Sequence, residues 1–208
     1  MTANTPPRLD PFINRRASDM FNTATVFFAT AGDFLKDIPE NAEESWFTAA
    51  RRAKLEVAVT NLALSIELLL KSLLLIMGHP PKKRTHDLLE LFERLPHEIK
   101  ESIEREYTER GGESPLGAAT TLQLVFHPAE TIPTDQQVDA LRRKLTLGAS
   151  LRDVLRSERN AFVIWRYLSE QAKAGETTVV RVQYGRLGVI ANSIQRHFKV
   201  INPPAAQS

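Results

Sequence analysis

Apolar residues recur every three or four positions along most of the chain, and this spacing predicts helices rather than strands. The longest apolar segment runs from about 43 to 77, and Gly78 with Pro80–Pro81 marks its end. A second leucine stripe (Leu64, Leu68, Leu75) lies apart from its main face, and a helix with two apolar faces is central in a bundle or covered by a partner chain. The main face consists of Leu55, Ala58, Leu62, Ile66, Leu69, Leu73 and Ile76.

Shorter apolar patterns surround this segment. Thr85 is expected to cap a short helix that begins at Asp87, and Pro96 to open the next one. The residues 177–184 alternate β-branched and polar side chains and predict a strand, and residues 122–126 are a second candidate for an extended piece. The chain is therefore predicted to be all-α, with five or six helices, a short C-terminal strand or hairpin and a terminal helix. The expected helices besides the long one cover about 17–37, 87–94, 96–110, 136–172 (with a kink or break at Gly148) and 186–199.

Proline and glycine mark the expected domain boundaries. Residues 1–14 contain three prolines, so we expect a poorly ordered tail, and residues 201–208 form a second tail. Between them, residues 15–200 are expected to fold as one domain, because a chain of 208 residues with 42% apolar side chains can bury one full core. Within this domain we expect a long loop over 111–134 and a strand–helix appendage over 176–200.

Composition and charge exclude some chemistries and select none. The chain has no cysteine, which rules out disulfides, thiolate nucleophiles and cysteine-ligated metal clusters. The formal net charge is only +2, but residues 87–113 hold nine acidic against four basic side chains and residues 138–173 eight basic against four acidic. These two segments could attract each other within one chain, or the basic one could face an anion.

No targeting or membrane segment is evident in the sequence. The N-terminus has no apolar run of the secretory type, and charged Glu67 and Lys71 interrupt the most apolar stretch, residues 62–77. We therefore expect a cytoplasmic protein that does not cross a membrane.

Few motifs in the chain carry recognisable chemistry. The five histidines show no metal-ligand spacing, and glycine-rich phosphate loops are missing, so neither a metal nor a cofactor is expected. The basic run 82–84 fits either a phosphate contact or a solvated turn. On one helix, Arg159, Arg166 and Glu170 would share a flank from which guanidinium groups could bind phosphate. The same segment also fits a packed helix whose arginines pair with Glu67 or with the acidic helix.

The order of three segments, NLALSIELLLKSLLLIMG, THDLLELFERLP and RNAFVIWRY, resembles the HEPN superfamily (higher eukaryotes and prokaryotes nucleotide-binding domain) over about 17–172. The resemblance implies an up-down helical bundle, often dimeric, from a prokaryote. Many such proteins are metal-independent RNases of toxin–antitoxin or phage-defence systems, and others are non-catalytic binding modules. The RNases carry Arg-x4-6-His with a polar neighbour of the arginine. Arg159 and Asn160 match this pattern, but Ile164, Trp165 and Arg166 occupy the histidine positions.

Three functions follow from these observations. The first is a homodimer that binds RNA or a nucleotide phosphate at a degenerate RNase site, with Arg159 and Arg166 as phosphate contacts, Asn160 as their orienter and Glu67 as a partner within the site. The second is an active metal-independent RNase that uses another group, such as His86, because cleavage needs a side chain that moves the 2′-hydroxyl proton. The third is a non-enzymatic module that recognises a protein through the acidic helix or the long loop.

Overall fold

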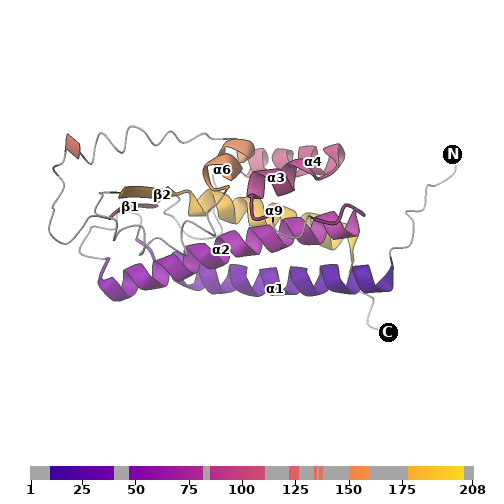
Figure 1. Ribbon diagram of the computed structural model, residues 1–208, viewed down its shortest axis with the longest axis horizontal. Coiled ribbons are helices and arrows are strands. Elements are labelled where there is room, and N and C mark those ends of the chain that lie inside the picture. The colour runs from indigo at the N-terminus through magenta and orange to yellow at the C-terminus, as the bar shows by residue number, and fades with distance from the viewer. Residues whose placement is uncertain are drawn as a thin grey trace.

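The computed structural model describes residues 10–39, 47–81, 85–110, 150–159 and 178–203, together with the strand 122–126 and residues 134, 136 and 137. Six helices fall within these residues, and the predicted all-α class is confirmed at this level (Figure 1). In chain order the elements are α1 (Pro11–Leu35), α2 (Ala49–Ile76), α3 (Leu88–Glu93), α4 (His97–Glu109), β1 (Leu122–Phe126), α6 (Leu151–Ser157), β2 (Thr178–Val182) and α9 (Tyr184–Ile201).

The two longest helices, α1 and α2, form an antiparallel pair along the long axis of the molecule (Figure 1). The helix α1 begins earlier than expected, since the Asp10 carboxylate accepts a hydrogen bond from the Phe12 N–H at 2.8 Å and Pro11 occupies the first turn. Residues 11–14, predicted as part of a tail, are therefore helical. At the same end of the antiparallel pair, Gly78 adopts φ 75°, the left-handed conformation predicted for the residue that ends α2.

The helix α2 is the centre of the fold, because α1 packs along one side of it and α9 along another (Figure 1). Its main apolar face is buried as predicted: Leu55, Ala58, Leu62, Ile66, Leu69, Leu73 and Ile76 are all at most 7% exposed. Leu75 of the second stripe is buried too, whereas Leu64 and Leu68 are half-buried. Among the described helices only α2 is long and apolar enough to cross a membrane, but 72% of its most apolar window is buried inside the fold.

The C-terminal helix α9 belongs to the core and is longer than the predicted 186–199. Ten of its residues are buried, including Tyr184 at its start. Near its end the ring of Phe198 stacks on Phe21 of α1, with centroids 4.1 Å apart and an interplanar angle of 8°. The Asn202 side-chain amide donates to the Ser18 hydroxyl at 3.2 Å. The segment expected as an appendage is therefore packed against the α1–α2 pair.

The two strands pair antiparallel, with Leu122 opposite Val182 and Phe126 opposite Thr178. The expected hairpin is wrong in one respect, because residues 127–177 separate these strands along the chain. The pair connects the segment after α4 to the start of α9, and such long-range pairing depends on the folded bundle rather than on a local turn.

The short helices begin and end at other residues than predicted. Asp87, not Thr85, caps α3: its Oδ1 accepts hydrogen bonds from two backbone N–H groups at 3.0 and 3.1 Å. Pro96 precedes α4 as its N-cap rather than opening it as the first helical residue. The helix expected from about 136, with a kink or break at Gly148, was also expected to continue past Ser157, where α6 ends instead. A turn follows in which the Arg159 carbonyl accepts from the Leu88 N–H at 3.2 Å.

Candidate functional site

Five polar side chains from three segments meet where α3 begins. Glu67 and Lys71 lie on α2, His86 and Asp87 precede α3, and Arg159 follows α6. A chain of contacts connects them, from Lys71 through Glu67 to His86, and then through the neighbouring Asp87 to Arg159. We refer to these five residues as the α3 cluster.

The Glu67 carboxylate is the buried centre of the α3 cluster, with 3% of its side chain exposed. Its Oε1 lies 2.5 Å from Lys71 Nζ, and both of its oxygens lie 3.1 Å from His86 Nδ1. A carboxylate is stable inside a protein only where charged or hydrogen-bonding partners replace water. Lys71 and His86 are these partners, so Glu67 fixes the position of the His86 ring.

Arg159 lies at the outer end of the α3 cluster, with 55% of its side chain exposed. Its Nε and Nη2 donate to Asp87 Oδ2 at 3.0 and 2.6 Å, while Asp87 Oδ1 caps α3. One carboxylate therefore anchors both the helix start and the guanidinium group. The sequence left two partners open for this arginine, Glu67 and the acidic helix. The observed partner, Asp87, belongs to the acidic segment, and Glu67 contacts Lys71 and His86 instead.

The other predicted site residues, Asn160 and Arg166, lie outside the described residues, and so does the basic run 82–84. Arg159 and Arg166 were predicted to share one flank because both were expected on a single helix. Since α6 ends before Arg159, helical spacing no longer supports that placement. The structure also brings His86, the alternative catalytic residue, into the α3 cluster, where it contacts Glu67.

The first part of the chain, which includes most of the α3 cluster, matches a known family. Residues 24–111 match the HEPN domain. No curated protein and no solved structure matches the chain. The HEPN resemblance predicted from the sequence is therefore confirmed over the segment from α1 to the end of α4. This HEPN segment contains four members of the α3 cluster, whereas Arg159 lies beyond it.

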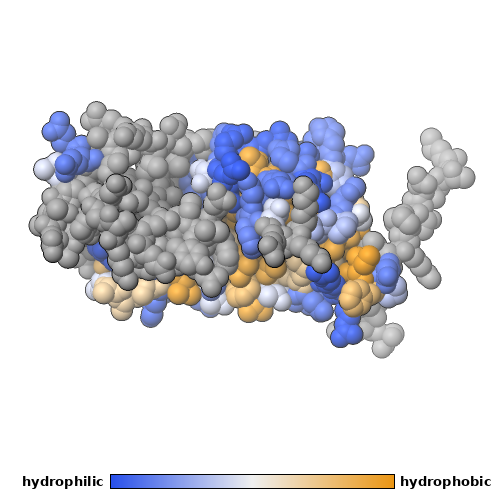
Figure 2. All heavy atoms as spheres, in the orientation of Figure 1, coloured by the Kyte–Doolittle hydropathy of each residue, from blue (hydrophilic) through white to orange (hydrophobic). Residues whose placement is uncertain are grey.

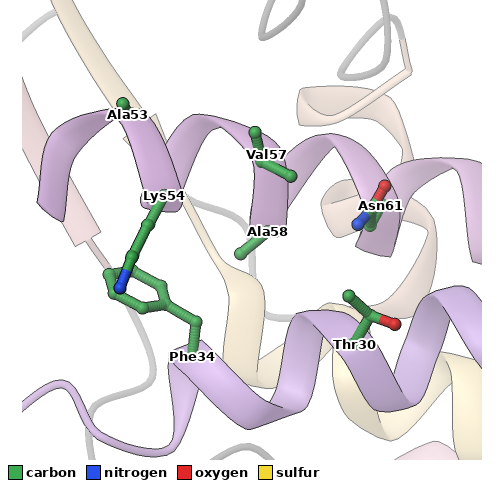
Figure 3. Close-up of a pocket in the computed structure, with 7 residues that line it drawn as sticks. All are labelled: Thr30, Phe34, Ala53, Lys54, Val57, Ala58 and Asn61. Atoms are coloured by element: carbon green, nitrogen blue, oxygen red, sulfur yellow. The ribbon is translucent and has the colours of Figure 1, made fainter. Parts of the chain in front are cut away.

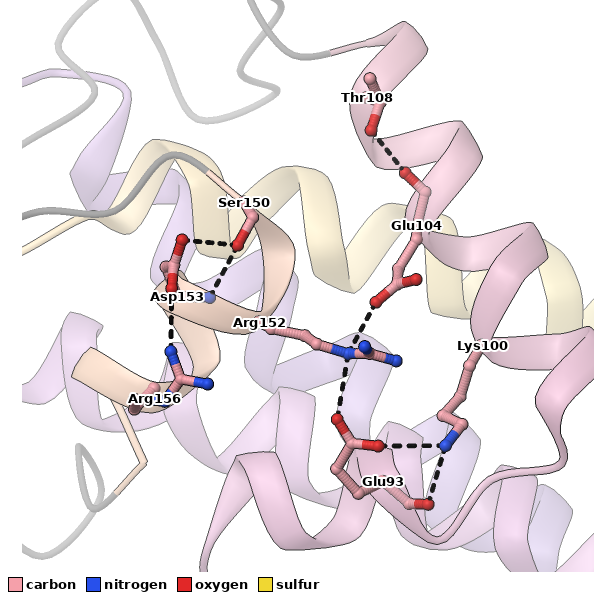
Figure 4. Close-up of polar contacts among 8 residues, drawn as sticks. All are labelled: Glu93, Lys100, Glu104, Thr108, Ser150, Arg152, Asp153 and Arg156. Carbon is pink, nitrogen blue, oxygen red and sulfur yellow. Dashed lines mark hydrogen bonds and ion pairs between the residues drawn. The ribbon is translucent and has the colours of Figure 1, made fainter.

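The acidic part of the HEPN segment pairs with the basic segment that follows it (Figure 4). From α6, Arg152 Nε reaches Glu93 of α3 at 3.0 Å and Glu104 of α4 at 2.9 Å. On α4 itself, Glu106 lies 3.2 Å from Arg110 and 3.3 Å from Arg196 of α9. Of the two alternatives left by the sequence, attraction within one chain is the observed one for Arg152, whereas the two partners of Glu106 lie outside the basic segment.

These ion pairs weaken the case for an acidic protein-binding surface. Three carboxylates that would have carried it are engaged inside the fold, namely Glu93, Glu104 and Glu106. The long loop, the other surface proposed for a protein partner, lies outside the described residues apart from β1 and Thr134.

Glu158 holds the turn that carries Arg159, and sequence reasoning missed it. Its side chain is 4% exposed, and burial raises the pKa of Glu158 to about 7. The carboxylate accepts a hydrogen bond from the Gln183 N–H at 3.3 Å, and the Gln183 amide donates to the Ser157 hydroxyl at 3.4 Å. These contacts connect the end of α6 to the start of α9. The sequence offered no signal for this role, because a single glutamate after a helix is usually exposed.

Metal-ligand groupings are missing from the described ranges, where no three His, Asp or Glu side chains come together to hold an ion.

Proposed function

We propose that this protein binds RNA or a nucleotide through a phosphate group, with Arg159 as the phosphate contact. One observation carries the proposal: a guanidinium group more than half exposed is held in place at two nitrogens by Asp87. Asp87 takes one N–H each from Nε and Nη2 and offsets the charge of the arginine, so a phosphate would be bound by the outer Nη1–Nη2 edge of the guanidinium group. A guanidinium group that is already fixed loses little entropy when it binds. The HEPN match supports a nucleotide-related function.

The proposal also assigns roles to Asn160 and Arg166, which lie outside the described residues, and to Glu67, which lies within them. In it, Arg166 is the second phosphate contact, Asn160 orients the arginines, and Glu67 supports the site through Lys71 and His86. As the HEPN resemblance implies, the protein acts as a homodimer in a prokaryotic toxin–antitoxin or phage-defence setting.

Arg159→Ala is expected to weaken the binding of single-stranded RNA by about 10- to 150-fold, since a hydrogen bond to a charged group contributes about 1.5–3 kcal/mol. The dependence of the affinity on salt should also fall by about one phosphate contact. Fluorescence anisotropy with a labelled oligonucleotide, measured over a series of salt concentrations, gives both quantities.

The matched control is Arg156→Ala, which removes an exposed arginine of α6 that pairs with Asp153 at 2.8 Å. This variant should bind RNA about as well as the unmodified protein. If Arg159→Ala and Arg156→Ala have the same affinity and the same salt dependence, Arg159 is not the phosphate contact.

A second candidate function is metal-independent RNA cleavage, which the contact between His86 and Glu67 favours. The imidazole is 47% exposed and is held at Nδ1 by a buried carboxylate. A carboxylate that orients an imidazole is an arrangement by which proteins move protons, and RNA cleavage without metal needs a group that removes the 2′-hydroxyl proton.

If this second function operates, His86→Ala is expected to slow cleavage at least about 100-fold in a chelating buffer, the usual contribution of a general base. The control is His97→Ala, which removes an exposed imidazole beside Glu101 and should leave the rate unchanged. Gel analysis of a labelled RNA measures both rates. An unmodified protein that binds RNA without cleaving it would reject the enzyme and retain the binding function.

A further inference from the structure

We propose that a pocket beside the end of α2 binds a small amphipathic anion. The pocket has a volume of about 360 Å³, within the range of about 300–1,000 Å³ typical of small-molecule sites. The pocket shares Lys71 with the α3 cluster, but Arg159 is not among its lining residues, and the inference does not depend on the proposed function. The lining residues are Arg16 and Met20 of α1, Leu68, Lys71 and Leu75 of α2, and Pro80 and Pro81 after it.

Five of the seven residues that line this pocket have apolar side chains, and the two cations contribute much of the remaining surface. Leu68, Lys71 and Leu75 follow one another at spacings of three and four on α2, so they share one side of that helix. Met20 comes from α1 and is half-buried, as is Leu68. This is the side of the second leucine stripe, and α1 covers it only in part. The pocket therefore suits a ligand with an apolar body.

Two cations give the pocket its charge. Lys71 is 13% exposed, and its ammonium group is already paired with Glu67. Arg16 is exposed and makes no hydrogen bond or ion pair with the residues that the structure describes. The charges of Lys71 and Glu67 cancel, so Arg16 leaves the pocket with a net positive charge. An anionic group on the ligand is the natural partner of this guanidinium.

The apolar wall and the cation together define the ligand chemistry as one anionic head on an apolar body. An aliphatic carboxylate and a nucleoside monophosphate share this chemistry. The carboxylate would fill the space among the leucine, methionine and proline side chains with a flexible chain, and the nucleoside monophosphate would fill it with a flat ring.

Isothermal titration calorimetry with two ligand pairs separates these sources. The pairs are octanoate with octanol, and adenosine monophosphate with adenosine, so that each anion has a neutral counterpart with the same body. We expect the anion of one pair to bind at least about tenfold more tightly than its neutral counterpart. The pair that shows this preference identifies the source of the ligand.

Matched variants of α1 assign the binding to the pocket. Arg16→Gln should abolish the preference for the anion, whereas Arg15→Gln should keep it, because Arg15 is also exposed but is not part of the pocket lining. Met20→Trp, which fills the pocket, should weaken binding about tenfold. If that variant does not fold, the comparison of Arg16→Gln with Arg15→Gln decides.

Two results would overturn the proposal: no binding of any of the four ligands at millimolar concentration, or equal binding by the Arg16→Gln and unmodified proteins. The Arg159→Ala protein keeps the pocket and should bind the anion normally. A loss of anion binding in that variant would place the ligand at the α3 cluster instead and would also reject the pocket. Failure of the pocket and failure of the RNA-binding proposal are therefore separate results.

A second hollow among the described residues, lined mostly by apolar side chains, carries no proposal of its own. It lies between α1 and α2 near the end of α1, where Phe34 and Thr30 face Val57 and Lys54 (Figure 3). Nothing among the described residues indicates what would cover it.

Discussion

Glu158→Gln is expected to stabilise the protein at about pH 8, raising the free energy of unfolding by about 2–3 kcal/mol. Burial raises the pKa of Glu158 from 4.5 to about 7, so above that pH the folded state must hold a charged carboxylate at a site that is 4% exposed. Glutamine is uncharged at every pH, and its side-chain oxygen can still accept the hydrogen bond from the Gln183 N–H.

The pH dependence follows from the direction of the pKa shift. Because the pKa of Glu158 is higher in the folded than in the unfolded state, protonation favours folding. This contribution is fully present below about pH 4.5 and is lost as the pH rises through about 7. At about pH 4 the Glu158→Gln and unmodified proteins should therefore be about equally stable.

Urea denaturation at the two pH values measures this effect, with Glu98→Gln as the control. Glu98 is an exposed residue in the first turn of α4, and its replacement should change stability by less than about 0.5 kcal/mol at either pH. An effect of Glu158→Gln that is the same at both pH values would show that desolvation of this carboxylate is not its cause.

Glu67→Ala is expected to destabilise the protein by about 3 kcal/mol, because it removes one partner of a largely buried ion pair. The ammonium group of Lys71, 13% exposed, would remain without its carboxylate, and the His86 ring would lose the group that orients it. Urea denaturation near neutral pH gives the change. Glu101→Ala serves as the control, since this carboxylate contacts His97 at the surface and should contribute less than about 1 kcal/mol.

A double variant tests whether the loss arises from the unpaired charge. When both partners of a buried pair are replaced by apolar residues of similar size, stability is usually kept. Glu67→Met combined with Lys71→Met should therefore recover most of what Glu67→Ala loses. Equal destabilisation by the single and the double variant would mean that packing at α2, rather than charge, sets the energy.

Hydrophilic and hydrophobic side chains are distributed unevenly over the surface of the described residues. In Figure 2 hydrophilic side chains gather over the region of α3, α4 and α6, and hydrophobic ones are more frequent along the α1–α2 side. Val26 and Val57, on these two long helices, are 64% and 59% exposed. The sequence pattern predicted the buried main face of α2 correctly, because this face follows the helical periodicity of its apolar residues.

Helix limits were harder to predict than the helices themselves. Both Thr85 and Asp87 can act as an N-cap, and only the packing of α3 selects Asp87. Likewise, the apolar pattern continues past Ser157, yet α6 ends there, and the Arg159 carbonyl that follows accepts a hydrogen bond from the distant Leu88 N–H. Local sequence gives the preference for a helix, and a contact with a distant segment decides where it stops.

For the candidate site, the sequence supplied the residue types but not their partners. It marked three residues as unusual. Glu67 is a charge within an apolar helix, His86 lies beside a helix start, and Arg159 lies in a segment that resembles the HEPN superfamily. It could not show that Arg159 pairs with Asp87, because 72 positions separate them along the chain. Nor did it indicate that Glu158 would be buried.

The sequence by itself determined the helical class, the central apolar helix with its glycine-marked end, and the resemblance to the HEPN superfamily, which is confirmed over residues 24–111. These properties depend on periodicity and on local backbone preferences, which each segment carries on its own. Only the tertiary structure decided the partners of Glu67 and Arg159, the burial of Glu158 and the pocket beside α2. Those properties depend on which segments meet, and hydrogen bonds and desolvation act on groups that are distant in the chain and adjacent only after folding.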